Sequence, residues 1–190
     1  IAISNELNQN IEAIEINENK NNEKLKFETL EINNASFKYK NNDEYIFKNL
    51  SLKINKSKIY GFIGTTGSGK STLIDLIMSL QDLDEGKIIL NNSIDLKKIR
   101  SQWHKLIGYV PQSIFLHDDS IKNNIAVGEY EDEINLHRLN KAIKYAQLEK
   151  YILNLKDGVD TIVGENGSKL SGGQIQRIGI ARALYINPEI

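Results

Sequence analysis

The chain has 190 residues, with 24 Lys and Arg against 25 Asp and Glu, a formal net charge of −1 and no cysteine. A chain of this length suits one domain with a subdomain, but not two full domains. The balanced charge argues against broad electrostatic binding to nucleic acid or to an anionic membrane, and the missing cysteine excludes disulfides and thiolate metal sites.

The start of the chain predicts a helix followed by a linker. Apolar residues recur there with helical spacing, at Ile3, Leu7, Ile11 and Ile14. The polar run 17–26 that follows is typical of a linker. No apolar run approaches the roughly 20 residues that cross a bilayer, and the start has no signal-peptide pattern. Because an initiator methionine is missing and the end is abrupt, we expect a piece of a longer polypeptide.

Several later stretches carry strand patterns. Residues 27–39 and 45–54 alternate apolar and polar side chains, as paired antiparallel strands do. The almost wholly apolar run 58–64 is typical of a buried central strand. Residues 86–92 predict another strand, and a third apolar run ends at Pro111.

A phosphate-binding motif closes the central run. Residues 64–71, GTTGSGKS, satisfy the pattern G-x-x-x-x-G-K-[ST] between a predicted strand and a helical stripe. The stripe consists of Leu73, Leu76, Ile77 and Leu80. Gly64, Gly67 and Gly69 can take positive φ, which lets the backbone N–H groups wrap phosphates. The alternative interpretation is a glycine turn with an incidental Lys-Ser pair.

The other residues of the motif also suit a nucleotide. Lys70 supplies a mobile cation for the β- and γ-phosphates, the Ser71 hydroxyl suits Mg²⁺, and Thr72 can add an outer phosphate contact. The full predicted phosphate-binding set is Gly64, Thr65, Thr66, Gly67, Ser68, Gly69, Lys70, Ser71 and Thr72. No [NT]-K-x-D element of GTP-specific switch proteins follows the loop, so the predicted ligands are ATP and Mg²⁺. The histidines, His104, His117 and His137, share no metal-ligand spacing and are assigned surface or packing roles.

The second half of the chain reads as helical. Residues 131–155 keep helical spacing on a charged background, at Leu136, Leu139, Ile143 and Ala146, and predict an inserted helical subdomain. Residues 169–177, KLSGGQIQR, then place two glycines behind a serine at the start of a helix that Pro188 ends. The apolar stripe of this helix is Ile175, Ile178, Ala181 and Leu184. Bare N–H groups at a helix N-terminus attract anions, so a second anion site is predicted.

This second site carries a family resemblance. The run 170–174, LSGGQ, together with the phosphate loop resembles the nucleotide-binding domain of ABC ATPases, from about Leu30 to the last residue. Further motifs follow in family order: ASFKY with Tyr39, GYVPQ with Gln112, TIVGENG with Glu165, and NPEI. The implied fold is α/β, a P-loop NTPase core of ABC type with an antiparallel β subdomain and an inserted α-helical subdomain at about 113–175. Residues 1–29 would be the end of a preceding transmembrane-domain helix plus a polar linker, and 30–190 a partial ABC ATPase domain.

The resemblance implies that the second anion site serves the nucleotide of another copy. Two domains would pack head to tail, as an expected homodimer, with each ATP between Lys70 of one and the turn of the other. That turn comprises Ser171, Gly172, Gly173 and Gln174, with Gln174 helping to set the loop. Closure would then depend on nucleotide state, because hydrolysis removes the bridging γ-phosphate.

Other roles follow from the same resemblance. Tyr39 would stack on adenine, the alternative being a strand residue that packs on a neighbour. Gln112 would place its amide oxygen near Mg²⁺ and the attacking water, the alternative being an ordinary turn glutamine. The catalytic residues are therefore expected to be Lys70 and Gln112, and the metal ligands Ser71 and Gln112. Arg177 and Arg182 are interpreted as structural and salt-bridged.

The branch of the family is predicted to be an exporter. Glu165 resembles the residue of the X-loop that touches a transmembrane part. The leading helix would be the end of the last transmembrane helix, fused upstream, although an expression remnant or a solvated helix is the alternative. The site of action would be the cytoplasmic face of the plasma or inner membrane. The sequence looks most like exporters of lipid-linked oligosaccharide or polysaccharide, with peptide or lipid export next.

Two alternative functions remain open from the sequence. One is a soluble ABC ATPase acting on DNA or ribosomes, although such proteins usually carry basic patches or coiled-coil insertions that are not found here. The other is a nucleotide-dependent interaction module without turnover. In the family, an apolar central strand ending in Asp and Glu, a D-loop and a switch histidine follow NPEI. We therefore expect this piece to have little activity alone and an apolar slot in its sheet.

Overall fold

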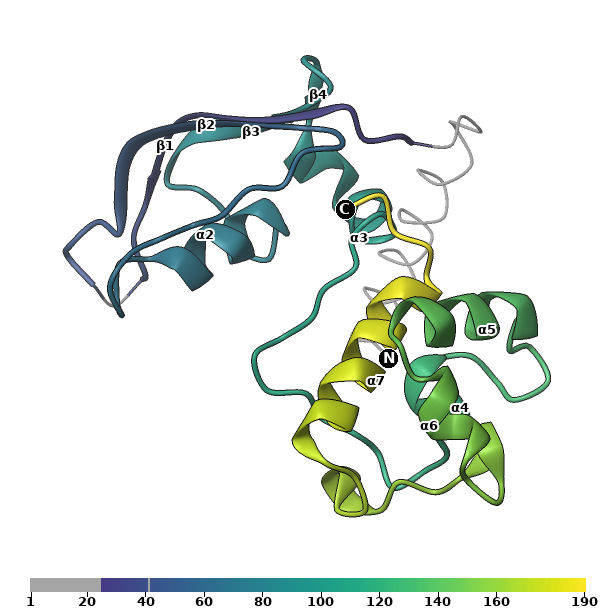
Figure 1. Ribbon diagram of the computed structural model, residues 1–190. Coiled ribbons are helices and arrows are strands. Elements are labelled where there is room, and N and C mark those ends of the chain that lie inside the picture. The colour runs from purple at the N-terminus through teal and green to yellow at the C-terminus, as the bar shows by residue number, and fades with distance from the viewer. Residues whose placement is uncertain (1–24, 41) are drawn as a thin grey trace, which may run out of the picture.

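The computed structural model describes residues 25–40 and 42–190, so the predicted helix at 3–14 and most of the predicted linker lie outside the described residues. Two units are visible in Figure 1: a sheet with one helix against it, and a group of helices below. A long loop after α3 (Arg100–His104) and the C-terminal segment after α7 (Gly172–Tyr185) join them. None of the described helices is both long and apolar enough to cross a membrane.

The first unit is an antiparallel sheet. Its strands are β1 (Thr29–Phe37), β2 (Phe47–Asn55), β3 (Glu85–Leu90) and β4 (Ile94–Asp95), in the spatial order β2-β1-β3-β4. The central strand β1 pairs with both neighbours, so that Leu30 lies opposite Ile54 on one side and Leu90 on the other. The antiparallel sheet predicted from residue alternation is therefore confirmed.

The core of this unit forms between the sheet and α2 (Lys70–Ile77). Alternate residues of β1 and β3 are buried, including Leu30, Ile32 and Leu90, and they share a core cluster with Leu73 and Leu76 of the helix. The two-residue period of the strands and the stripe of the helix thus meet on one face. This packing fixes the start of α2, which carries the phosphate loop.

The second unit is helical and is built around α7. Its other helical segments are α4 (Ile121–Ile125), α5 (Leu136–Tyr145), α6 (Glu149–Leu153), η2 (Gly158–Asp160) and η3 (Glu165–Gly167). Ile178 and Ala181 of α7 are fully buried and share one core with Leu139 and Ile143 of α5. The predicted helical stripes are confirmed here, except that Leu136 is largely exposed. Helix α7 ends three residues before Pro188, as predicted.

The apolar run 58–64 is not the buried strand that the sequence predicts. No strand is assigned to it, and Ile59 and Ile63 are fully exposed. A strand is stable only when neighbouring backbones bond to it, and none of the described strands pairs with this run. The apolar pattern of residues 58–64 is therefore that of a strand that needs neighbouring strands in order to form.

The apolar run that ends at Pro111 also forms no strand among the described residues. It does pair with the last residue of the chain. The Ile190 N–H donates to the Leu106 carbonyl at 3.1 Å, and the Ile190 carbonyl accepts from the Gly108 N–H at 2.8 Å. This alternation of donor and acceptor about Ile107 is the parallel pairing pattern.

The predicted stripe on α2 is wrong in its last member. The helix ends at Ile77, and Ser79 takes a left-handed conformation with φ 58°. Leu80 is therefore turned out of the helix and more than half exposed. A left-handed residue ends a helix because it turns the chain away from the helical path.

Side chains from distant segments hold the entry to β1 in place. The Asn91 amide accepts N–H bonds from Glu28 and Thr29 and donates to the Lys26 carbonyl at 2.7 Å. A carboxylate oxygen of Glu189 accepts from the Phe27 N–H at 2.8 Å. Four hydrogen bonds thus fix the backbone of residues 26–29. The sequence does not predict this arrangement.

Candidate nucleotide-binding site

The phosphate loop lies between the exposed run 58–64 and α2. Gly67 and Gly69 have φ of 83° and 88°, in the left-handed region that favours glycine. Gly69 is also the N-cap of α2 and is crowded, since a Cβ there would lie 2.7 Å from Ile46 Cγ2 and 2.8 Å from Phe47 Cζ. Backbone conformation and space together require glycine at this position.

Gly64 differs from the other two glycines of the motif. It does not have positive φ, contrary to the use that the sequence suggests for it. A Cβ at Gly64 would instead lie 2.5 Å from Ser68 Oγ. This glycine therefore permits the two ends of the loop to approach each other.

Lys70 bends back across the loop that precedes it. Its ammonium donates to the carbonyl oxygens of Gly64, at 3.0 Å, and Thr65, at 2.7 Å, and to Ser68 Oγ at 3.4 Å. The cation is thus held inside the turn by groups of partial negative charge. A phosphate in the turn would be a stronger acceptor than these carbonyls, so the side chain is in place for charge-assisted bonds.

Tyr39 contacts the helix that follows the loop. Its hydroxyl lies 3.0 Å from Thr72 Oγ1, and its ring meets Phe37 edge-on with centroids 5.1 Å apart. Thr72 is buried, whereas Tyr39 is 41% exposed. The structure thus brings together Tyr39, the loop and Thr72 from separate parts of the sequence.

The second glycine turn has a different local geometry. Ser171 is the N-cap of the 14-residue helix α7, and its hydroxyl accepts from the Gln174 N–H at 3.3 Å. In return, Gln174 Oε1 accepts from the Ser171 N–H at 2.7 Å, which completes a capping box. Gly172 and Gly173 are exposed, and a Cβ on either would meet no atom within 4 Å. The turn is therefore held by two reciprocal hydrogen bonds and has open space beside both glycines.

The two glycine sites lie on different units of the chain. The loop belongs to the sheet unit, whereas the start of α7 lies at the far end of the helical unit in Figure 1. Gln112 is exposed on the segment that joins the two units, and Glu165 is exposed in η3, shortly before Ser171. The described chain does not form one closed pocket from all of these predicted residues.

The two arginines after the turn bind backbone, not the carboxylates expected of salt bridges. Arg177 Nη1 donates to the Gln147 carbonyl at 2.9 Å. Arg182 donates through Nε to Asn124 O at 2.9 Å and through Nη2 to Phe115 O at 3.0 Å. Burial lowers the pKa of the Arg182 guanidinium. The structural role predicted for both is retained, but the expected partners are wrong, and no local pattern could have indicated carbonyl groups so far away in sequence.

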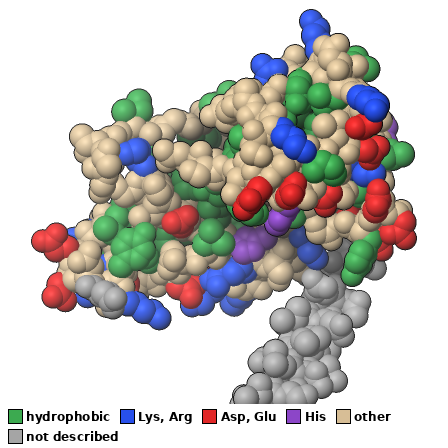
Figure 2. Space-filling model, turned by 90° about the horizontal axis from the view of Figure 1, so that it is seen from below, with side chains coloured by type: hydrophobic (Ala, Val, Ile, Leu, Met, Phe, Trp, Pro, Cys, Tyr) green, Lys and Arg blue, Asp and Glu red, His purple; other side chains and the backbone are tan. Residues whose placement is uncertain are grey.

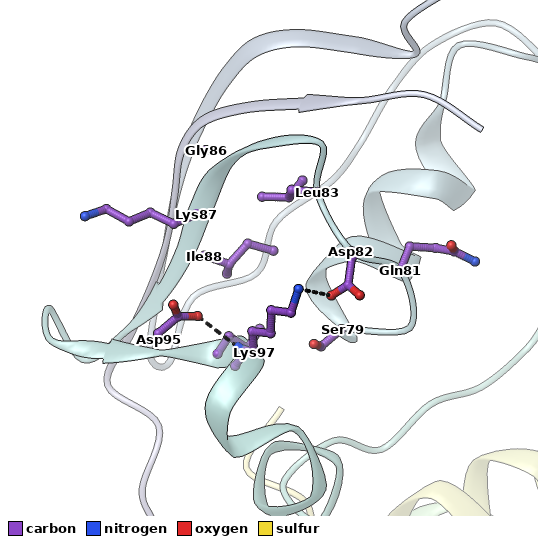
Figure 3. A pocket seen from close by; sticks show the side chains of 10 residues that line it. Ser79, Gln81, Asp82, Leu83, Gly86, Lys87, Ile88, Asp95 and Lys97 are labelled. Atoms are coloured by element: carbon purple, nitrogen blue, oxygen red, sulfur yellow. Dashed lines mark hydrogen bonds and ion pairs between the residues drawn. The ribbon is translucent and has the colours of Figure 1, made fainter. Parts of the chain in front are cut away.

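A separate pocket lies on the sheet unit, away from both glycine sites (Figure 3). Asp82 and Lys97 face each other across it at 3.4 Å, and Asp95 accepts from the Lys97 N–H. Burial raises the pKa of Asp82, but the hydrogen bond and charge of Arg100 outweigh it, so the net pKa lies below its usual range. None of the motif residues lines this pocket.

The described histidines and acidic residues offer no metal cluster. Among residues 25–40 and 42–190, no group of three or more such side chains could hold a metal ion. His104 bonds the Met78 carbonyl at 2.7 Å and His117 packs its ring edge-on against Phe115.

Comparison with known proteins gives consistent matches. The profile of the family described as ABC transporter matches residues 47–190. A multidrug resistance-like ATP-binding protein of Buchnera aphidicola subsp. Schizaphis graminum is 44% identical over 161 residues, and an ATP-dependent lipid A-core flippase of Pasteurella multocida 40% over 162. Each match covers 85% of this chain but only 27% and 28% of the relative.

A solved structure is also similar. It is that of a bacterial Atm1-family ABC exporter with ATP bound, with a TM-score of 0.76 and 34% sequence identity. The match covers 85% of this chain and 28% of the exporter chain.

Proposed function

This chain belongs to the ABC transporter family, and we propose that it is the ATP-binding domain of an exporter whose paired domains close on ATP. The single observation that supports the proposal is that the two glycine turns, at 64–71 and 171–174, lie on separate units of one chain. The two turns of one chain do not come together around a common ligand, so each turn suits a ligand that is shared with a second copy. Hydrolysis of the shared ATP would then open the pair and drive transport.

The phosphate loop is the primary ATP site in this proposal. Lys70 binds the β- and γ-phosphates and is expected to be catalytic together with Gln112, and Thr72 contributes an outer contact. The Lys70 ammonium lies inside the turn on two carbonyl oxygens, which supports the role proposed for Lys70. Tyr39 stacks on adenine, which its half-exposed ring beside Thr72 supports. The remaining contacts come from the backbone of residues 64–69 and from Ser71.

Ser71 and Gln112 are the proposed ligands of Mg²⁺. Both residues are exposed, and a hydroxyl and an amide oxygen are hard donors of the kind that Mg²⁺ accepts beside phosphate oxygens. The ion would neutralise part of the phosphate charge.

The second turn completes the ATP site of the partner. Ser171, Gly172, Gly173 and Gln174 face outward from a capped helix, and the N-terminus of a helix of this length carries partial positive charge. The glycines leave the backbone N–H groups bare, which lets a γ-phosphate approach closely. We expect the pair to be a head-to-tail homodimer.

The upstream part of the protein is proposed to be a transmembrane domain. The relatives are three to four times longer than the region matched here, which leaves room for a pore. Residues 1–29 would be the end of its last helix with a linker, 30–190 a partial ATPase domain, and about 113–175 its helical subdomain. Glu165 would touch the pore from that subdomain, at the cytoplasmic face of the plasma or inner membrane. Lipid-linked oligosaccharide or polysaccharide is the proposed cargo.

Nucleic acid is not expected as a partner. The formal net charge is −1, and acidic and basic side chains are interspersed on the face seen in Figure 2. A nucleic-acid interface requires a basic patch that neutralises phosphates.

Catalysis is proposed to need residues that follow Ile190. The ladder begun between Ile190 and the segment 106–108 supports a parallel strand at this place, and the exposed Ile59 and Ile63 support a second neighbour beside the run 58–64. The 190-residue chain alone should therefore hydrolyse ATP at a rate close to that of its Lys70→Ala variant. Robust turnover by the purified chain, lost on Lys70→Ala, would contradict this.

The shared site is tested in the full-length protein with a pair of variants. Lys70→Ala should abolish hydrolysis, because the phosphate loop loses its cation. Ser171→Arg should leave the Kd for ATP within about twofold but reduce turnover at least a hundredfold, because a large cation fills the outward turn and blocks closure. Asn154→Arg adds the same charge at the exposed end of α6 and should leave turnover unchanged. Intact turnover in Ser171→Arg would contradict the proposal that the ATP site is shared between two copies.

A further inference from the structure

The end of strand β1 is shaped by a β-bulge. Before the bulge, Asn33 pairs with Lys87 of β3. After it, Ser36 pairs with Glu85, so β1 carries one extra residue between the two pairs. Asn34, in this interval, has a left-handed φ of 49°. Because a bulge bends its strand and shifts the pairing, it sets the position of the residues that follow β1.

Gly86 of β3 makes room for the bulge. Its φ is 84°, and a Cβ there would lie 2.5 Å from the carbonyl oxygens of Asn33 and Asn34. Any larger residue would push β3 away from the bulged backbone of β1. The close approach of the two strands brings Asp84, which precedes β3, up to the chain that leaves β1.

Asp84 bonds the chain on both sides of Phe37. Its N–H donates to the Ser36 carbonyl at 3.0 Å, and its Oδ2 accepts from the Lys38 N–H at 2.8 Å. Lys38 lies one residue beyond the end of β1, so the carboxylate takes over where the pairing of strands ends. A carboxylate that accepts from a backbone N–H makes a charge-assisted hydrogen bond, which is stronger than a neutral one. The backbone that leads into Tyr39 is therefore held by Asp84.

The ring of Tyr39 is held by other contacts than its backbone. The ring meets Phe37 edge-on, and its hydroxyl lies 3.0 Å from Thr72 Oγ1. These two contacts restrict the tilt of the ring, whereas the bond from Lys38 to Asp84 fixes the peptide from which the ring projects. Stacking depends on the position of the ring centre as well as on tilt, so both sets of contacts matter for it.

We propose that Asp84 is a positioning residue for ATP, which holds the Lys38 backbone so that the Tyr39 ring lies where adenine stacks. The inference rests on the proposed function, in which Tyr39 stacks on the adenine of the ATP at the phosphate loop. Asp84 acts through Tyr39 and makes no contact of its own with the nucleotide. Its loss therefore weakens ATP binding and leaves the chemical step unchanged.

Asp82 provides a matched control two residues earlier. Like Asp84 it is exposed, but its carboxylate pairs with Lys97 at 3.4 Å and with Arg100 at 2.7 Å. Asp82→Ala therefore removes the same charge from the same segment without releasing the chain that leads to Tyr39.

The test measures binding of a non-hydrolysable ATP analogue to the full-length protein by isothermal titration. Asp84→Ala should raise the Kd about fivefold, because the Lys38 N–H loses its charged acceptor. Its kcat at saturating ATP should stay within about twofold of wild type. Asp84→Asn keeps an acceptor oxygen for the Lys38 N–H, so its Kd should stay within about twofold of wild type, as should that of Asp82→Ala.

A double variant separates positioning of the ring from general damage to the domain. If Asp84 acts only through the ring, Tyr39→Ala already removes all that Asp84 contributes to binding. The variant with both Tyr39→Ala and Asp84→Ala should then have the Kd of Tyr39→Ala within about twofold. A further loss of about fivefold in the double variant overturns the inference, because a weakened fold would lower the affinity whether or not the ring is present.

The outcomes also separate the inference from the proposed function. If Tyr39→Ala weakens binding about tenfold but Asp84→Ala stays within about twofold of wild type, the inference is overturned and the stacking role of Tyr39 stands. An unchanged Kd in Tyr39→Ala contradicts the stacking role and overturns the inference with it. Equal losses in Asp84→Ala and Asp82→Ala also overturn the inference, since they would assign the effect to negative charge in this segment.

Discussion

The two glycine turns of this chain use the same residue type for different physical reasons. In the phosphate loop, Gly67 and Gly69 have positive φ, and Gly69 has no room for a Cβ against Ile46 and Phe47. In the second turn, Gly172 and Gly173 belong to a regular helix with open space around them. Glycine in the first turn thus serves the fold of its own chain, whereas in the second it leaves a surface bare.

The side chains around the turns follow the same division. Lys70 folds inward onto the carbonyls of its own loop, so its cation lies inside the first turn. The side chains of Ser171 and Gln174 each bond the other residue's backbone across the helix start, and Gly172 and Gly173 between them are exposed. This difference supports the proposal that the first turn contains a phosphate of its own ATP and that the second turn is brought to a phosphate of the partner's ATP.

Replacing one glycine in each turn should separate these roles most clearly. Gly69→Ala should destabilise the protein by about 3 kcal/mol, because left-handed backbone and crowding against Ile46 and Phe47 both oppose a Cβ. Gly172→Ala should change the unfolding free energy by about 0.5 kcal/mol or less, since alanine fits a helix. Thermal unfolding of the purified protein measures both. Equal destabilisation by the two variants would break the comparison.

The same pair sharpens the comparison when activity is measured. Gly69→Ala should weaken ATP binding, because the added Cβ distorts the phosphate loop, so its defect appears in the Kd for ATP. Gly172→Ala should bind ATP normally but turn over more slowly, because the added methyl lies where the partner's phosphate must approach. Weak ATP binding by Gly172→Ala would show that its turn serves the ATP of its own chain.

The next largest effect is expected at Tyr39, which belongs to the inward site. Tyr39→Ala should weaken ATP binding about tenfold, because stacking of an aromatic ring on a base contributes on the order of 1–3 kcal/mol. Tyr39→Phe keeps the ring and loses only the bond to Thr72, so its ATP affinity should stay within about twofold. Isothermal titration with a non-hydrolysable ATP analogue distinguishes the two. Equal losses would mean that Tyr39 acts through Thr72 and not through its ring.

The parts that could be predicted from sequence depend on local patterns. The phosphate loop, the alternating strands and the cap at Ser171 each lie within a dozen neighbouring residues, so composition and spacing carry them. Local patterns gave a wrong prediction where the structure of a segment depends on whether another strand pairs with it. The run 58–64 has the composition of a buried strand, but Ile59 and Ile63 are exposed because no described strand pairs with it.

Contacts between distant residues could not be predicted at all. Asn91 holds the backbone of residues 26–29, more than sixty positions away, and Arg182 reaches Phe115 and Asn124. Nothing near Asn91 or Arg182 in sequence marks these targets, because a backbone carbonyl or N–H has no residue-specific signal. Arginine suggests a carboxylate partner, and that expectation was wrong for Arg182.

The smallest effect is expected from loosening the outward turn without filling it. Gln174→Ala removes the bond from the Ser171 N–H and should cost about 1 kcal/mol of stability, as the loss of a helix cap does. Gln176 is exposed and lies two residues after Gln174. Gln176→Ala should lower the unfolding free energy by less than about 0.5 kcal/mol and leave turnover unchanged. If the capping box holds the turn ready for the partner's ATP, Gln174→Ala should lower kcat a few-fold while the Kd for ATP is unchanged. A changed Kd would instead connect this turn to the phosphate loop of its own chain, and the division between inward and outward sites would no longer hold.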